Sequence, residues 1–179
     1  MDQANNHLQI KLCVSGAAET GHCGIDAYDK GIALGTEIAK QGAVVVTGAT
    51  TGFPMWAAMG AKQAGGFSIG FSPANNEREH VETFSLPLEY MDMIVYTGFG
   101  FPGRDLILTR SSDAVLFGCG RIGTIHEFTI AFEDKKPIGI LTNTGGITDE
   151  IDHLLTVAKR GRAKIVFDKN PPIFTNYTK

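Results

Sequence analysis

The sequence has little of what marks membrane proteins or nucleic-acid-binding proteins. No apolar run reaches the roughly 20 residues that a membrane-spanning helix needs. Sixteen basic residues are outnumbered by nineteen acidic ones, and the net charge of -3 leaves no basic stripe for DNA or RNA. Residues 1–9 are polar and lack the charged-then-apolar layout of a signal peptide. We therefore expect a cytoplasmic protein whose partners include neither a membrane nor a nucleic acid.

Cysteine is also scarce. The three cysteines, Cys13, Cys23 and Cys119, are too few and too scattered to predict a disulfide framework. The dipeptide His22-Cys23 suggests a metal site, but its spacing matches no structural zinc pattern and further ligands would have to converge from elsewhere. Cys119 is either a reactive thiol or a small apolar filler, and the filler is the simpler interpretation. We expect no metal site.

The composition is that of an ordinary globular protein. Of the 179 residues, 43% are hydrophobic and 20% charged, which argues against disorder and fits one domain with a sizeable core. No internal repeat divides the chain. We therefore expect residues 1–179 to form a single domain, with peripheral tails at 1–9 and 170–179.

Apolar runs alternate with longer segments of helical period, the layout of βα units around a parallel sheet. Strands are predicted over 8–15, 43–47, 67–71, 91–96, 114–117, 137–141 and 164–167. Helices are predicted over 25–41, 54–64, 104–112, 124–133 and 148–159. Residues 73–88 are polar and without a clear period, so they predict a long, lid-like loop. The pattern predicts a three-layer, doubly wound α/β domain with a mostly parallel sheet of about seven strands.

Four glycine-bearing turns follow predicted strands. They are Ser15-Gly16-Ala17, Thr47 to Gly52, Thr97 to Gly103 and Gly118 to Thr124. Doubly wound sheets bind ligands beyond the carboxyl ends of their strands, so four such turns favour a nucleotide-sized ligand at that edge. Neither the dinucleotide fingerprint nor the phosphate-binding loop with its lysine is present, which disfavours NAD binding and ATP hydrolysis.

The last of these turns is the most informative. An apolar strand ends in glycines and a helix is predicted to begin at Thr124, an arrangement that favours a phosphate at the helix N-terminus. Glu127 follows at once, and a carboxylate beside a phosphate needs a reason to be there. One reason is complementation of the helix dipole. The other is chemistry on the sugar that carries the phosphate.

These residues resemble a known family. The chain is similar to the LOG, or lysine-decarboxylase-like, family of Rossmann-like nucleotide-binding proteins, a group that includes the molybdenum cofactor carrier protein. The family hallmark P-G-G-x-G-T-x-x-E corresponds to Cys119–Glu127, and the family's arginine in the preceding helix corresponds to Arg104. The resemblance extends from about Leu12 to Leu155.

The resemblance implies cleavage of a nucleoside 5′-monophosphate into free base and ribose 5-phosphate, without a required cofactor. It implies that Arg104 and Glu127 are the catalytic pair. The partner would be a nucleoside monophosphate or a related phosphorylated small molecule. Residues expected to bind the phosphate or nucleotide are Ser15, Gly16, Ala17, Gly48, Thr50, Gly52, Gly103, Gly120, Arg121, Ile122, Gly123 and Thr124.

Departures from the family pattern keep a second function open. Cys119 replaces the hallmark proline, Arg121 replaces a glycine, and His126 stands before the glutamate as either a surface residue or a proton carrier. The family's histidine upstream of Arg104 is missing. The alternative is therefore a protein that binds or carries a nucleotide or cofactor without turning it over. Met55, Trp56 and Met59, at helical spacing, indicate packing or the interface of a homodimer or higher homo-oligomer.

Overall fold

Seven short apolar runs form the strands of the computed structural model, which describes residues 8–161 and 164–171. Their bounds are β1 (Lys11–Ser15), β2 (Val44–Thr47), β3 (Ser68–Ser72), β4 (Met93–Tyr96), β5 (Ala114–Phe117), β6 (Ile138–Leu141) and β7 (Ile165–Asp168). Every residue of β2, β5 and β6 is buried, because both faces of a parallel sheet are covered. Most of the predicted tails, 1–9 and 170–179, lie outside the described residues.

The strands form one parallel sheet in the order β4-β3-β2-β1-β5-β6-β7. Cys13 of β1 is paired with Val46 of β2 on one side and with Val115 of β5 on the other. The chain therefore builds the sheet outward from β1 in one direction and then from β5 in the other. The predicted doubly wound α/β fold is confirmed, and the junction of β1 with β5 is its topological switch point.

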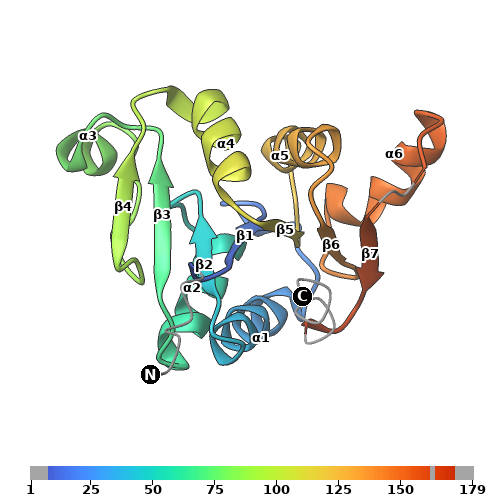
Figure 1. The fold of residues 1–179 in the computed structure, drawn as a ribbon, viewed down its shortest axis with the longest axis horizontal. Coiled ribbons are helices and arrows are strands. Elements are labelled where there is room, and N and C mark those ends of the chain that lie inside the picture. Colours follow the sequence, from blue (N-terminus) through green and yellow to red (C-terminus); the bar gives the residue numbers. More distant parts are fainter. Residues whose placement is uncertain (1–7, 162–163, 172–179) are drawn as a thin grey trace, which may run out of the picture.

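Helices cover both faces of the sheet (Figure 1). The helices α1 (Ala27–Lys40) and α2 (Phe53–Gln63) pack on one face, and α4 (Gly100–Ser111) and α5 (Ile122–Glu133) on the other. The remaining elements are α3 (Glu77–Glu82), the 3-10 turn η1 (Ile147–Glu150) and α6 (Ile151–Val157). None of the helices among the described residues is long and apolar enough to cross a membrane.

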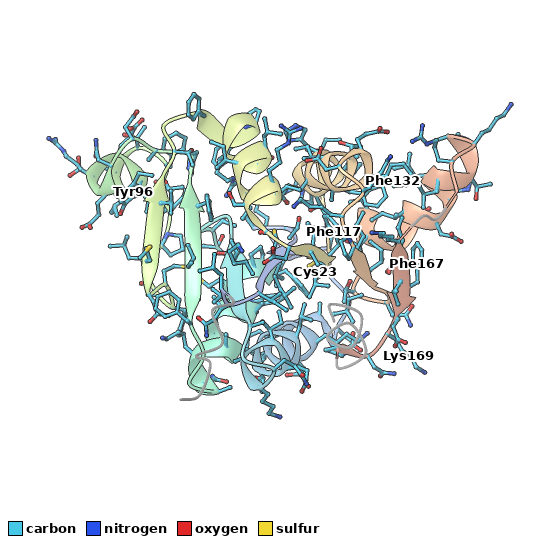
Figure 2. The ribbon with its side chains drawn as sticks, in the orientation of Figure 1. Cys23, Tyr96, Phe117, Phe132, Phe167 and Lys169 are labelled. Carbon is cyan, nitrogen blue, oxygen red and sulfur yellow. A yellow bond between two sulfur atoms is a disulfide. The ribbon has the colours of Figure 1, made fainter. Side chains whose placement is uncertain are left out.

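Side chains from alternate strand positions build two cores. One lies against α1 and α2 and includes Leu12, Val14, Leu34, Ile38 and Phe53, all at most 1% exposed. The other lies against α4 and α5, where Phe117 of β5 contacts Phe128 of α5 edge to face at 5.8 Å between ring centroids. Phe128 in turn contacts Phe132, with 5.9 Å between ring centroids. Figure 2 labels Phe132 beside α5. This aromatic row fixes α5 over β5.

The segment 73–88 is not the lid-like loop that its polar sequence predicted. It contains the short helix α3, whose first turn is capped by Asn76 accepting a hydrogen bond from Glu79 N at 3.0 Å. His80 of α3 is fully buried, with Nδ1 2.8 Å from Ser72 Oγ and Nε2 3.0 Å from Pro87 O. The sequence pattern did not predict this helix, because the helix is held in place by a single buried histidine with polar partners and not by an apolar face.

The bounds of three predicted helices are also corrected. The helix predicted over 104–112 begins at Gly100, so Arg104 is its fifth residue. The helix predicted over 124–133 begins at Ile122, because Arg121 already has the extended backbone of an N-terminal cap residue. Glu127 is therefore the sixth residue of α5 and lies beyond its first turn. The helix predicted over 148–159 is divided into η1 and α6, and α6 ends at Val157.

Trp56 of α2 has packing partners within the chain. Its ring contacts Tyr28 at 5.3 Å and Phe53 at 6.1 Å between centroids, and it is half-buried. These contacts account for the helical spacing of the large side chains in α2. The subunit interface stays a prediction.

Close approach of α1 to α2 gives a stability prediction. A Cβ on Gly35 would overlap the backbone carbonyl of Ala57, which cannot retreat without moving α2. We expect Gly35→Ala to lower the free energy of unfolding by about 1–3 kcal/mol in urea titrations. Gly123→Ala, in α5 with nothing near its Cβ, is the matched control and is expected to cost nothing. Equal losses in the two variants would contradict the packing argument.

Candidate functional site

A pocket of about 300 Å³ lies where the carboxyl ends of β1 and β2 meet the first turns of α4 and α5. This is the switch point of the sheet, where doubly wound folds bind ligands. Eleven of the residues predicted for the site line the pocket: Ser15, Gly16, Ala17, Gly48, Thr50, Arg104, Arg121, Ile122, Gly123, Thr124 and Glu127. The fold thus brings together segments more than a hundred residues apart in the chain.

Three predicted residues lie outside this lining. Gly52 caps α2 with a positive φ of 73°, and Gly103 lies inside α4 against Phe99. Gly120 accepts a hydrogen bond from Ile147 N at 2.9 Å, which ties the β5 turn to η1.

Glu127 is the buried acid of the pocket. Its residue is 7% exposed, and Oε2 accepts a hydrogen bond from the Ser15 hydroxyl at the end of β1. Burial, followed by the negative charge of Asp105, raises the pKa of Glu127 to about 7, against the lowering effects of Arg104 and the Ser15 hydrogen bond. A carboxyl group with such a pKa exchanges protons near neutral pH, as a general acid or base must. Because Glu127 lies beyond the first turn of α5, dipole complementation does not explain it.

Asp105 links the groups around Glu127. Its Oδ1 accepts from Arg104 Nε at 2.9 Å, and its Oδ2 lies 2.9 Å from His126 Nδ1. The Arg104 and Asp105 side chains are only 9% and 8% exposed, so they form a buried ion pair. The sequence left His126 as either a surface residue or a proton carrier. In the structure it contacts Asp105, which lines the pocket.

Arg104 is held by backbone oxygens. Nη1 donates to Gly48 O and, at 3.3 Å, to Phe71 O, while the guanidinium lies 5.5 Å from the Phe101 ring centroid. A Cβ on Gly48 would overlap Nη1, so only glycine lets the arginine reach this carbonyl. Among the described residues, Ser15 provides the direct hydrogen bond to Glu127, whereas Arg104 acts on it through charge.

The first turn of α5 forms one end of the pocket, where Arg121, Ile122, Gly123 and Thr124 line it. The N–H groups at a helix start have no partner within the helix and point outward together with the positive end of the dipole. Thr124 Oγ1 accepts from Arg121 N at 3.2 Å, which shapes this turn. The exposed side chain of Arg121 forms an ion pair with Glu19 of the loop after β1. Surface ion pairs are weak, so Arg121 remains available to an anion.

Sequence reasoning missed six lining residues: Val14, Ala18, Glu19, Pro54, Phe101 and Asp105. Asp105 was the one with a signal, since it is a charged residue directly after Arg104 in a predicted helix. Glu19 had none, because its partner Arg121 is 102 positions away.

The cysteines differ from the prediction. A disulfide joins Cys23, in the loop after β1, to Cys119, in the turn after β5, and Figure 2 shows Cys23 at the centre of the molecule. The Cα atoms are 5.4 Å apart, within the range for disulfides. Cys119 is therefore not a filler with a free thiol. Its partner is 96 residues away, so the sequence gave no local sign of the bond.

Comparison with known proteins agrees with this fold. An uncharacterized protein of Archaeoglobus fulgidus is 30% identical over 132 residues, 74% of this chain and 82% of that protein. The structural genomics target TM1055 superposes with a TM-score of 0.77 at 27% identity, covering 91% of this chain and 94% of that one. The molybdenum cofactor binding protein of the phototrophic bacterium Rippkaea orientalis gives a TM-score of 0.70 at 26% identity, covering 94% and 93%.

A family model covers nearly the whole chain. The match extends over residues 9–172, from the strand that precedes the pocket to beyond the last strand of the sheet. The LOG-like resemblance that rested on Arg104 and the Cys119–Glu127 motif is thereby confirmed. The protein belongs to the SLOG cluster4 family.

Proposed function

We propose that this protein hydrolyses the N-glycosidic bond of a nucleoside 5′-monophosphate, releasing free base and ribose 5-phosphate. The observation that carries the proposal is Glu127, a buried carboxyl group with a pKa of about 7 in the same pocket as an anion-binding helix start. A pocket that only held a phosphate would gain nothing from a buried acid, which repels the ligand whenever it is ionised.

The chemistry of the lining residues supports the following arrangement of the ligand. The 5′-phosphate binds at the first turn of α5, where Gly123 and Thr124 present backbone N–H groups and Arg121 adds a charge. The ribose then lies near Glu127, about one helical turn further along α5. Phe101 and Pro54, which also line the pocket, offer an apolar surface for the flat base.

The reaction needs one water molecule. The Glu127 carboxylate takes a proton from this water molecule while the oxygen of the water forms a bond to C1′ of the ribose. The C1′–N bond breaks, its electron pair stays on the base nitrogen, and that nitrogen is protonated from Glu127 or solvent. Positive charge develops on the ribose on the way, as in glycoside hydrolysis, and the buried carboxylate stabilises it. We propose that no cofactor takes part.

Ser15 holds Glu127 by a hydrogen bond, and the charges of Arg104, Asp105 and His126 shift its pKa. The ion pair of Asp105 with Arg104 keeps a fixed negative charge beside Glu127, which raises its pKa, and Arg104 limits that rise. His126, 43% exposed at its side chain, lies 2.9 Å from Asp105 through Nδ1, outside the pocket lining. These groups together with burial therefore keep the pKa of Glu127 raised toward neutral pH.

Glu127→Gln tests the reaction. We expect the release of free base from AMP, GMP or CMP to fall by about 100- to 10,000-fold, because the amide can neither accept a proton nor offset positive charge. Wild-type activity should rise with pH and level off above about 7, since the ionised carboxylate is the active form. Base release is measured by chromatography.

Ser15→Ala is a second test of the pH dependence. The Ser15 hydrogen bond lowers the pKa of Glu127, so its loss should move the rising limb to higher pH while activity persists. Full activity of Glu127→Gln, or an unshifted limb in Ser15→Ala, would contradict the mechanism.

Recognition of the phosphate gives a separate prediction, tested in the Glu127→Gln background so that the ligand survives. Arg121→Gln and Thr124→Val should each weaken AMP binding by about tenfold, as expected for the loss of a charged phosphate contact or of the turn that presents the N–H groups. Adenosine binding should not change. Calorimetric titration measures both ligands.

Glu19→Gln acts in the opposite direction. It frees Arg121 from its ion pair and should leave AMP binding equal or about two- to fivefold tighter. Equal losses for AMP and adenosine in the Arg121 and Thr124 variants would place the phosphate elsewhere in the pocket.

A carrier function is the second candidate. The likeness to the molybdenum cofactor binding protein of Rippkaea orientalis favours it, because that protein is similar over nearly its whole length. Arg121, in place of the glycine of the family hallmark, also lines the pocket with a cationic side chain that can bind the phosphate of a phosphorylated cofactor. Tight binding of monophosphates without any base release would favour this function over hydrolysis.

A further inference from the structure

A cluster of metal-ligating side chains lies outside the pocket lining. It consists of His22, Cys23 and Cys119, whose ligand atoms all lie within 4.8 Å of one another. Two come from the loop after β1 and one from the turn after β5, so only the folded chain brings them together. The phosphate-binding residues of the proposed function have no part in it.

The surrounding backbone is fixed by hydrogen bonds from three loops. Cys119 N donates to Thr144 Oγ1 at 2.8 Å, and Cys119 O accepts from Ala17 N at 2.7 Å. Cys23 pairs with Gly145 in an isolated antiparallel bridge, and Gly24 N donates to Thr144 O at 2.8 Å. The side chains thus have a rigid frame, which is what a preorganised metal site requires.

A disulfide alone does not explain why the imidazole of His22 lies beside these sulfur atoms. His22 Nε2 lies 3.7 Å from Cys119 Sγ. With Zn–S bonds of about 2.3 Å and Zn–N bonds of about 2.0 Å, a tetrahedral zinc ion spaces its nitrogen and sulfur ligands by about 3.5 Å. The imidazole is therefore already placed for such an ion beside a sulfur that is completely buried.

We propose that the reduced form of the cluster binds Zn²⁺ through His22 and the two thiolates. Thiolate and imidazole ligands without a carboxylate suit this ion. His22 is exposed, so the fourth ligand comes from solvent. Reduction by a phosphine converts the disulfide, the phosphine and one water molecule to two thiols and the phosphine oxide. Zinc then replaces the two thiol protons, which are released. The disulfide and the zinc complex exclude each other, because both use the same sulfur electron pairs.

The test uses the full chain, reduced with a phosphine under argon, desalted and equilibrated with Zn²⁺ or with Co²⁺ as a spectroscopic probe. We expect one zinc per reduced chain and a thiolate-to-cobalt charge-transfer band, and neither in the oxidised protein. Cys23→Ser and Cys119→Ser should lose stoichiometric binding. His22→Gln should bind at least about tenfold more weakly, a loss that even outer partners of metal ligands produce.

His153→Gln is the matched control, because His153 is an exposed histidine on α6 far along the chain from the cluster. It should bind zinc like the wild type. If a cysteine variant fails to fold, His22→Gln still decides, since its side chain is exposed and removing it leaves the core intact. No zinc on the reduced wild type, or equal binding by His22→Gln and His153→Gln, would overturn the proposal and leave a structural disulfide. Neither result bears on base release, so the proposed hydrolysis is tested separately.

Discussion

The burial of one carboxyl group governs the architecture of the site. Glu127 lies on the inner side of α5, over the end of β1, where Ser15 is the nearest hydrogen-bond donor. Ionising a buried carboxyl group is costly unless opposite charge lies close by. Arg104 supplies that charge, but Asp105 neutralises part of it. The site therefore stays poised between two protonation states.

This balance depends on the backbone as much as on the charges. Arg104 can approach Glu127 because its guanidinium is anchored on the Gly48 and Phe71 carbonyls at the ends of β2 and β3. Both carbonyls lie within reach of one guanidinium because strands of a parallel sheet end at the same edge. The aromatic row of Phe117, Phe128 and Phe132 sets the position of α5 on the other side. Small shifts of either element would change the charge of Glu127.

The turn after β5 contributes residues both to the cysteine cluster and to the ligand pocket. On its inner side Cys119 is bonded to Cys23, and on its outer side Arg121 caps α5 at the pocket mouth. The hallmark proline and glycine of the family are thus replaced by residues with contacts of their own. Both replacements tie the turn to the loop after β1, one through sulfur and one through the ion pair with Glu19. The ligand pocket and the cysteine cluster therefore use the same two loops, but no residue belongs to both.

The sequence by itself determined the order of strands and helices and the doubly wound class, because periodicity and glycine turns are local or nearly local signals. The family resemblance predicted that Arg104 and Glu127 share one site, and both line the pocket. The sequence did not predict α3, whose anchor is the buried His80, nor the true start of α5 at Ile122. Only the tertiary structure decided that Ser15 contacts Glu127, that Glu19 contacts Arg121 and that Cys23 joins Cys119. Each of these pairs spans roughly a hundred residues, and a parallel sheet brings such distant strand ends together without leaving a pattern in either segment.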